Sequence, residues 1–164
     1  MRYPELYRPD DEDYRPVATI RTFFMDGLDR RAAETIVERV ETAPAPMAAA
    51  QLRVLGGAMS RVPADATAFA HRERRILANV AAIYTRPEER PVHEAWVAGL
   101  AGELGPHEAG AYVGFLGDEG EERVRAAYPG PTWDRLTAIK ARYDPDNLFH
   151  LNQNIPPAPE GPER

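Results

Sequence analysis

The sequence contains no cysteine among its 164 residues. This absence excludes disulfide bonds, thiolate metal ligands and a thiol nucleophile. Serine is almost as scarce, because Ser60 is the only one and no Gly-x-Ser-x-Gly motif surrounds it, which excludes a serine hydrolase of the nucleophile-elbow type. The four histidines His71, His93, His107 and His150 form no His-x-x-x-His pair, so no metal site is predicted.

Long apolar runs and an excess of positive charge are missing as well. No uncharged stretch approaches the ~20 residues that a membrane-spanning helix needs, and the N-terminal residues 1–7 lack the apolar region of a signal peptide. The 26 acidic residues outnumber the 20 basic ones and give a net charge of −6, which is a poor match to a nucleic-acid backbone. We therefore expect a globular cytoplasmic protein with neither a nucleic-acid nor a membrane partner.

Two proline-containing ends flank a patterned middle. Residues 1–16 hold three prolines and an acidic run, and we expect them to form an irregular N-terminal segment. Residues 158–164 combine proline and glycine with few apolar side chains, which predicts a disordered tail. The ordered part is expected to lie between them.

The middle of the sequence predicts more strands than single helical crossovers. Strands are expected at 17–25, 48–55, 58–62, 75–84 and 111–115, with a bend at Gly56-Gly57 between the second and the third. Helices are expected after Asp29 and at 86–104, 119–128 and 131–143. Three consecutive strands favour an α+β fold with a largely antiparallel sheet and helices packed on one face.

A turn and a run of amides follow the last predicted helix. Asp144-Pro145-Asp146-Asn147 has the Asx and proline chemistry of a turn, after which Leu148 and Phe149 are expected to pack into the core. Three successive amide side chains come next: Asn152, Gln153 and Asn154. Amides supply both donors and acceptors, so they suit the edge of a flat heterocycle and a cluster of buried backbone groups equally well.

The stretch that ends in these amides resembles a known family. Residues 143–157, Tyr-Asp-Pro-Asp-Asn-Leu-Phe-His-Leu-Asn-Gln-Asn-Ile-Pro-Pro, are similar to the C-terminal signature of berberine-bridge-enzyme-like FAD-linked oxidases, which are flavoproteins of the vanillyl-alcohol-oxidase type. Residues 55–59, 66–72 and 111–118 also resemble blocks of that family. The resemblance implies that 17–139 is part of a substrate-type domain and that 140–157 contacts the flavin. The family's N-terminal FAD-binding portion, with its flavin-linking His and Cys, has no counterpart here.

The resemblance implies roles for several residues. Tyr112 is the expected catalytic residue, as a proton acceptor or hydrogen-bond partner beside the flavin, and the alternative is a strand tyrosine packed in the core. Gly114 stands where the family usually has Asn. Three residues are expected to bind the flavin, with loop fixation as the alternative for the middle one: Asn152, Gln153 and Asn154. Gln51 and Arg53 share a strand face that is either a substrate pocket or simply solvated.

Taken together, the sequence suggests the C-terminal part of an FAD-dependent oxidoreductase that oxidises an alcohol or amine carbon of a small molecule by hydride transfer to flavin. FAD is expected to bind only if the missing FAD domain is supplied. The alternative is a truncated or split, non-catalytic domain that associates with itself or with a separate FAD-binding chain through an exposed apolar face.

Overall fold

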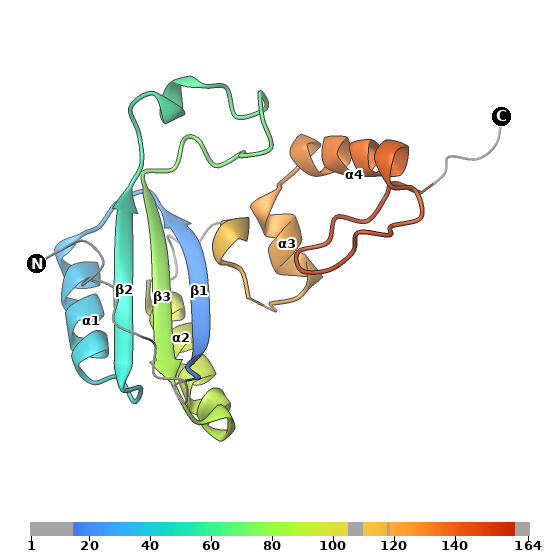
Figure 1. Cartoon of the computed structure of the whole chain (residues 1–164). Helices are drawn as coiled ribbons and strands as arrows, with labels where there is room; N and C mark the ends of the chain where they lie inside the picture. The colour runs from blue at the N-terminus through green and yellow to red at the C-terminus, as the bar shows by residue number, and fades with distance from the viewer. Residues whose placement is uncertain (1–14, 105–109, 118, 160–164) are drawn as a thin grey trace, which may run out of the picture.

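A three-stranded antiparallel sheet forms the centre of the molecule. The computed structural model describes residues 15–104, 110–117 and 119–159. The strands β1 (Val17–Met25), β2 (Met47–Val54) and β3 (Ile76–Tyr84) lie in the order β1-β3-β2, with β3 between its two neighbours (Figure 1). Strand alternation places one set of side chains on a helix-covered face and the other on the opposite face. The α+β fold with an antiparallel sheet that the sequence predicts is confirmed.

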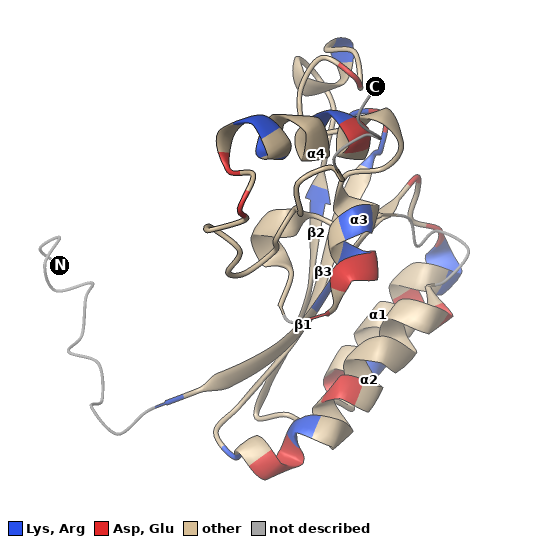
Figure 2. Cartoon of the chain, turned by 90° about the vertical axis from the view of Figure 1, so that its right-hand side faces the viewer, with Lys and Arg blue, Asp and Glu red and all other residues tan. Residues whose placement is uncertain are grey.

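Two helices cover one face of this sheet. Helix α1 (Arg30–Glu41) begins where the Asp29 carboxylate accepts the backbone N–H of Ala32 at 2.7 Å, an N-cap that contributes about 1 kcal/mol. Helix α2 (Arg90–Glu103) follows the short 3₁₀ turn η3 (Pro87–Glu89), and a quarter turn of the molecule shows both helices on the same side of the sheet (Figure 2). The indole N–H of Trp96 donates to the carbonyl of Arg39 at 3.1 Å and joins α2 to α1.

The main core lies between these helices and the sheet. Its side chains are almost completely buried and come from β1, β3 and α2: Phe23, Met25, Ala78, Val80, Ala82, Trp96, Val97, Leu100, Ala101 and Leu104. Burial of an apolar side chain of this size stabilises a fold by roughly 1.5–3 kcal/mol. The side chains on the helix-covered face therefore form the core, and those on the opposite face of the sheet are not part of it.

Two predicted strands are wrong. Residues 58–62 contain the 3₁₀ turn η2 (Met59–Arg61), because Gly56 and Gly57 have positive φ angles of 145° and 62° and turn the chain out of the sheet after Leu55. Residues 111–115 contain the 3₁₀ turn η5 (Val113–Phe115). The Tyr112 N–H donates to the Thr22 hydroxyl at 3.3 Å rather than to a strand carbonyl.

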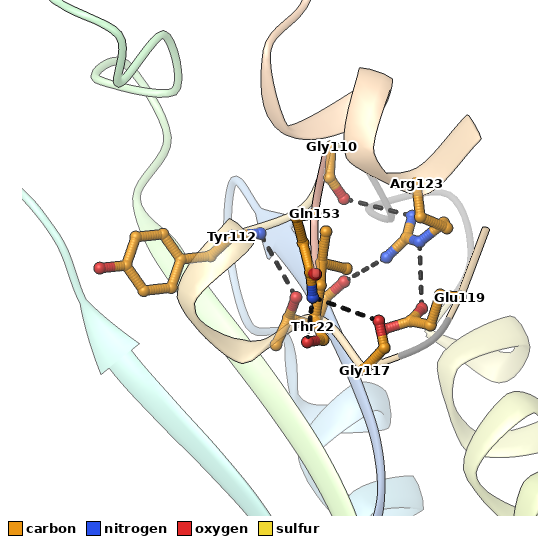
Figure 3. Close-up of polar contacts among 8 residues, drawn as sticks. Thr22, Gly110, Tyr112, Gly117, Glu119, Arg123 and Gln153 are labelled. Atoms are coloured by element: carbon orange, nitrogen blue, oxygen red, sulfur yellow. Dashed lines mark hydrogen bonds and ion pairs between the residues drawn. The ribbon is translucent and has the colours of Figure 1, made fainter. Parts of the chain in front are cut away.

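Hydrogen bonds from Arg123 connect the last third of the described chain to β1. Helices α3 (Glu121–Ala127) and α4 (Pro131–Tyr143) lie beyond β1 in Figure 1. The Arg123 guanidinium donates to the carbonyls of Thr22 at 2.5 Å and Gly110 at 3.4 Å, and it pairs with Glu119 at 3.2 Å (Figure 3). Charge-assisted bonds to backbone of this kind fix the path of residues 110–117 across the sheet.

His71 packs between the sheet and α3. Its ring stacks on Phe24 with 4.3 Å between centroids, and its Nε2 lies 3.1 Å from the Ala126 carbonyl oxygen. Burial lowers the pKa of His71 below its ordinary value, and the bond to Ala126 opposes that shift. Gly110 makes room for the ring, since a Cβ there would lie 2.2 Å from the His71 Cε1 and the backbone φ is +67°.

No helix within the described residues has the length and apolar character to cross a bilayer. The same residues contain no group of three or more His, Cys, Asp or Glu side chains placed to hold a metal ion. Of the predicted terminal segments, residues 1–14 and 160–164 lie outside the described residues. The cytoplasmic location remains a prediction.

Candidate functional site

Three polar side chains gather on the sheet face opposite α1 and α2. Gln51 pairs with Asn79 across β2 and β3, and the Gln51 carbonyl Oε1 accepts from the Asn79 amide at 3.4 Å. The same oxygen accepts from the Arg53 guanidinium at 2.9 Å. Gln51 and Arg53 are exposed, whereas Asn79 is only 7% exposed. The face predicted as a substrate pocket is therefore polar at its centre.

Two aromatic residues from the segment after Gly110 border these polar groups. The Arg53 guanidinium lies 4.7 Å from the centroid of the Phe115 ring. Tyr112 meets Phe115 edge-on at 5.4 Å and Phe69 at 6.3 Å. We call Gln51, Arg53, Asn79, Tyr112 and Phe115 the sheet-face cluster. The Phe115 ring thus links Tyr112, the predicted catalytic residue, to Arg53, which is in turn bonded to Gln51.

The phenol of Tyr112 points away from the polar contacts around Thr22 and Arg123 (Figure 3). Its oxygen makes no hydrogen bond with any described residue, and the residue is half-buried. Burial raises the pKa of Tyr128, and the nearby Tyr112 phenol raises it further. Among the described residues, the Tyr112 hydroxyl thus has no hydrogen-bond partner, and a catalytic role for it remains a prediction.

Gly114 determines where the Tyr112 ring can lie. A Cβ at this position would approach the Tyr112 ring to 2.9 Å, which is closer than real Cβ contacts allow. An asparagine, which the family usually has here, would push the ring away. The departure from the family pattern at Gly114 is thus coupled to the placement of Tyr112.

The three successive amides line an open hollow of about 880 Å³ beside α3 and α4. Asn154 is partly buried, and its Oδ1 is shielded from solvent with no partner among the described residues. Asn152 is exposed and adopts a left-handed φ of 57°. Trp133 and Arg125 also line the hollow, with the guanidinium 5.3 Å from the indole centroid. We call this feature the amide hollow.

Gln153 differs from its two neighbours because its amide is already engaged. Its Nε2 donates to the carbonyls of Leu116 at 2.6 Å and Gly117 at 3.3 Å (Figure 3). These bonds tie the C-terminal segment to the residues that follow Tyr112. The geometry is that of the loop-fixing alternative, and flavin contact by any of the three amides remains a prediction.

Leu148 and Phe149 do not pack into the core as expected. Their side chains are 73% and 79% exposed, and that of Leu151 is 80% exposed. The reason is a polar clamp at the end of α4, where the Asp144 carboxylate accepts the N–H groups of Leu148 at 2.7 Å and Phe149 at 3.0 Å. Lys140 pairs with Asp144 and donates to the Phe149 carbonyl at 2.7 Å. The backbone faces inward and the apolar side chains face outward.

Sequence reasoning missed Asn79 and Phe115. Asn79 is the one amide in the apolar strand Ile76–Tyr84, and that isolation was a usable signal because a polar side chain in a buried strand needs a partner. Phe115 gave no such signal, since residues 111–115 read as an apolar strand. Its contact with Arg53 depends on the 3₁₀ turn that replaces that strand.

Comparisons with known proteins first show the class of proteins to which this chain is similar. The chain is 35% identical over 136 residues to YgaK, an uncharacterized FAD-linked oxidoreductase of Bacillus subtilis, and the match covers 83% of this chain and 30% of YgaK. It is 37% identical over 103 residues to YvdP, another uncharacterized FAD-linked oxidoreductase of Bacillus subtilis, covering 63% of this chain and 23% of YvdP. The fold matches a berberine bridge enzyme variant with a TM-score of 0.76 at 21% identity, over 88% of this chain and 34% of that one. The homologues are thus FAD-linked oxidoreductases.

The family follows from the last part of the chain. Residues 111–156 match the model of the berberine and berberine-like family, and this stretch includes Tyr112 and all three amides. Residues 111–156 are therefore similar to the berberine-like domain, and the resemblance drawn from the motifs is confirmed. The chain spans only about a quarter to a third of the length of the relatives it matches.

FAD is the cofactor that these homologues imply, and the residues of the amide hollow can be compared with its flavin ring and with its diphosphate. Asn154 offers a shielded acceptor without a partner and Asn152 an exposed amide, which suit the donors and acceptors of a flavin ring edge. The same hollow is lined by the carboxylates Glu121 and Glu122, which repel a diphosphate, and its Arg125 cation lies over Trp133. The described residues thus fit the ring edge of FAD and not its diphosphate.

Proposed function

We propose that this chain forms the substrate-side wall of an FAD-linked oxidoreductase that oxidises an alcohol or amine carbon by hydride transfer to the flavin. The observation that carries the proposal is the continuity of residues 112–117. Tyr112 and Phe115 belong to the sheet-face cluster, while the Leu116 and Gly117 carbonyls hold Gln153 at the amide hollow. One short segment therefore contacts both the predicted substrate side and the predicted flavin side.

Each residue of the wall has a separate task. FAD, when bound, supplies the hydride acceptor. Tyr112 hydrogen-bonds the substrate hydroxyl at its phenol oxygen and acts as the general base for the hydroxyl proton. Gln51 and Arg53 orient the substrate on the sheet face. Asn152 and Asn154 hold the flavin ring edge, and Gln153 positions the segment that carries them.

The rest of the FAD site comes from a separate FAD-binding chain in this proposal. The acidic rim of the amide hollow supports this division, because the diphosphate must lie elsewhere. The exposed apolar loop of Leu148, Phe149 and Leu151 provides a docking surface next to the amides. A cytoplasmic location is part of the same proposal.

A second candidate is a non-catalytic domain that associates with itself. The same apolar loop favours it, since two copies of the loop bury each other as readily as a partner chain buries one. The two candidates differ in whether flavin is ever retained.

The visible spectrum of the protein tests the proposal. The purified chain is expected to be colourless, and the chain co-expressed with the part of YgaK outside the matched region is expected to purify as a yellow complex. Asn154→Ala should lower the bound flavin several-fold in that complex, because the ring edge loses an acceptor. Gln51→Ala, which removes an amide outside the hollow, is the matched control and should retain flavin.

Three outcomes would count against this reading. Equal flavin retention in Asn154→Ala and in the parent complex would assign that amide to loop structure. Stoichiometric flavin on the chain alone would contradict the need for a partner. A colourless homodimer that ignores the YgaK part would favour the non-catalytic candidate.

A further inference from the structure

Asn79 holds an acceptor that the fold leaves without a donor. The residue is more than nine-tenths buried at the centre of the sheet, and its Oδ1 is shielded from solvent with no hydrogen-bond partner among the described residues. A buried acceptor without a donor lowers the stability of the fold. Such a cost at the centre of a candidate site points to a ligand that satisfies it.

The neighbours of Asn79 determine which of its two polar atoms is free. Arg53 is only a donor, so the Gln51 atom that it contacts at 2.9 Å must be the carbonyl Oε1. That oxygen also faces Asn79 at 3.4 Å, and only the Asn79 NH₂ group can donate to it. The Asn79 oxygen is therefore the unpaired atom, and it accepts only from a hydroxyl or N–H group.

The strand residues on this face carry charge of one sign. Strand alternation places on it the residues that alternate with the core, and these are apolar apart from Thr22, Gln51, Arg53 and Asn79. Arg53 is thus the only charged strand residue on the face in the described structure, and no strand carboxylate accompanies it. A cationic ligand would meet a like charge here, whereas an uncharged or anionic one would not.

We propose that Asn79 and Arg53 select a hydroxylated substrate that is uncharged or anionic, and that they disfavour a cationic amine. This inference rests on the proposed function and narrows its substrate from an alcohol or amine to an alcohol. The Asn79 Oδ1 accepts a substrate hydroxyl, and Arg53 donates to a second substrate oxygen. Gln51 and Arg53 are exposed and bonded to each other, and in this proposal both side chains rotate to admit the ligand to Asn79.

Three sugars that differ in one substituent test this selection on the full chain without flavin. D-glucose is neutral, D-glucuronate is anionic, and D-glucosamine is cationic at pH 6. Side-chain NH₂ resonances of Asn79 and Gln51 report binding in two-dimensional ¹H–¹⁵N spectra. Glucuronate and glucose are expected to shift both resonances, with affinities at least about fivefold above that of glucosamine.

Two variants separate the roles of the two residues. Arg53→Gln removes the like charge, so it should bring the affinity for glucosamine close to that for glucose and leave glucose binding in place. Asn79→Asp keeps the shape and adds a carboxylate, so glucosamine should gain affinity relative to glucose. The backbone resonances of each variant report whether the sheet is intact, and Arg53→Gln, at an exposed position, keeps the test decisive if Asn79→Asp fails to fold.

Equal affinity for the three sugars, or no shift at Asn79 with any of them, would overturn the inference and leave a bound water as the partner of Oδ1. Because the sugar titrations use no flavin, their outcome does not depend on the visible-spectrum test of flavin binding. If the complex with the YgaK part is yellow but the chain does not discriminate among the sugars, the proposed substrate class is wrong and the proposed function still stands.

Discussion

At the residue scale, the chemistry of the sheet face depends on which polar atoms are already satisfied. The amide of Gln153 is engaged by two backbone carbonyls, while the Tyr112 phenol and the Asn79 oxygen have no partner among the described residues. Groups that already donate to the chain hold structure, and groups that are free can meet a ligand. Tyr112 is therefore the residue on which the proposed proton transfer depends.

Tyr112→Phe is expected to lower turnover of the flavin-loaded complex by about 10²-fold or more, because general base catalysis typically contributes 10²–10⁴. Bound flavin, measured by absorbance, should not change. Tyr128→Phe is the matched control, since Tyr128 is a neighbouring phenol whose pKa burial raises. Unchanged turnover in Tyr112→Phe, or an equal loss in Tyr128→Phe, would remove Tyr112 from the mechanism.

Alternation along β2 was enough to predict that Gln51 and Arg53 share a face, because successive strand residues point to opposite sides. The pairing of Gln51 with Asn79 could not be predicted from the sequence, because it depends on the register between two strands separated by a long loop. The outward display of Phe149 was also out of reach, because an apolar residue after a turn is more often buried than exposed.

At the element scale, the polar clamp on α4 fixes the loop that follows it. The hydrogen bond from Lys140 holds the pKa of Asp144 below its ordinary value of 3.8, the N–H groups of Phe149 and Leu148 act in the same direction, and burial opposes them. A carboxylate whose pKa is lower in the folded than in the unfolded chain stabilises the fold at pH values above its unfolded-state pKa. This stabilisation is lost as the pH falls through the folded-state pKa. The clamp is thus intact at neutral pH and opens below pH 3.8.

Asp144→Asn is expected to increase hydrogen exchange at the Leu148 and Phe149 amides by about tenfold at pH 7, because two charge-assisted bonds become neutral. In the parent chain, the protection factors should be constant at neutral pH and decline only below pH 3.8. Asp146→Asn, two residues along the same turn, should leave both amides protected. Equal protection in Asp144→Asn would show that the loop holds itself without the clamp.

Most elements were predictable from local patterns, and the two failures share a cause. The three strands and the longer helices have periodic apolar residues and clear stop signals, as at Asp29 and at the end of α4. Residues 58–62 and 111–115 have strand-like composition as well, but neither pairs with a strand of the sheet. Gly57 turns the first out of the sheet, and the Thr22 hydroxyl takes the Tyr112 N–H of the second.

At the scale of the whole molecule, the exposed loop of Leu148, Phe149 and Leu151 is the apolar surface on which the proposed docking depends. The chain spans about a quarter to a third of the length of its relatives, and among the described residues the amide hollow is lined by the carboxylates Glu121 and Glu122 as well as by Arg125. Charged residues of both signs are scattered along α1 and α2, so the helix-covered face does not suggest a second ligand surface (Figure 2).

Phe149→Ser is expected to weaken binding to the part of YgaK outside the matched region by about tenfold or more, since buried aromatic side chains dominate interface energies. The melting temperature of the chain alone should hardly change, because the side chain is 79% exposed. Val54→Ser alters an equally apolar side chain, 86% exposed at the end of β2, and should leave binding unchanged. Equal weakening by both variants would place the partner on a different surface.

The sequence by itself determined the fold class, the family resemblance and the sharing of one strand face by Gln51 and Arg53, because strand and helix periodicity, turn residues and contiguous motifs are local properties. Only the tertiary structure decided that Asn79 joins them, that Gln153 ties the C-terminal segment to residues 116–117, and that Phe149 faces outward. Each of these depends on which donors and acceptors meet across long stretches of chain, and spacing along the sequence does not encode that.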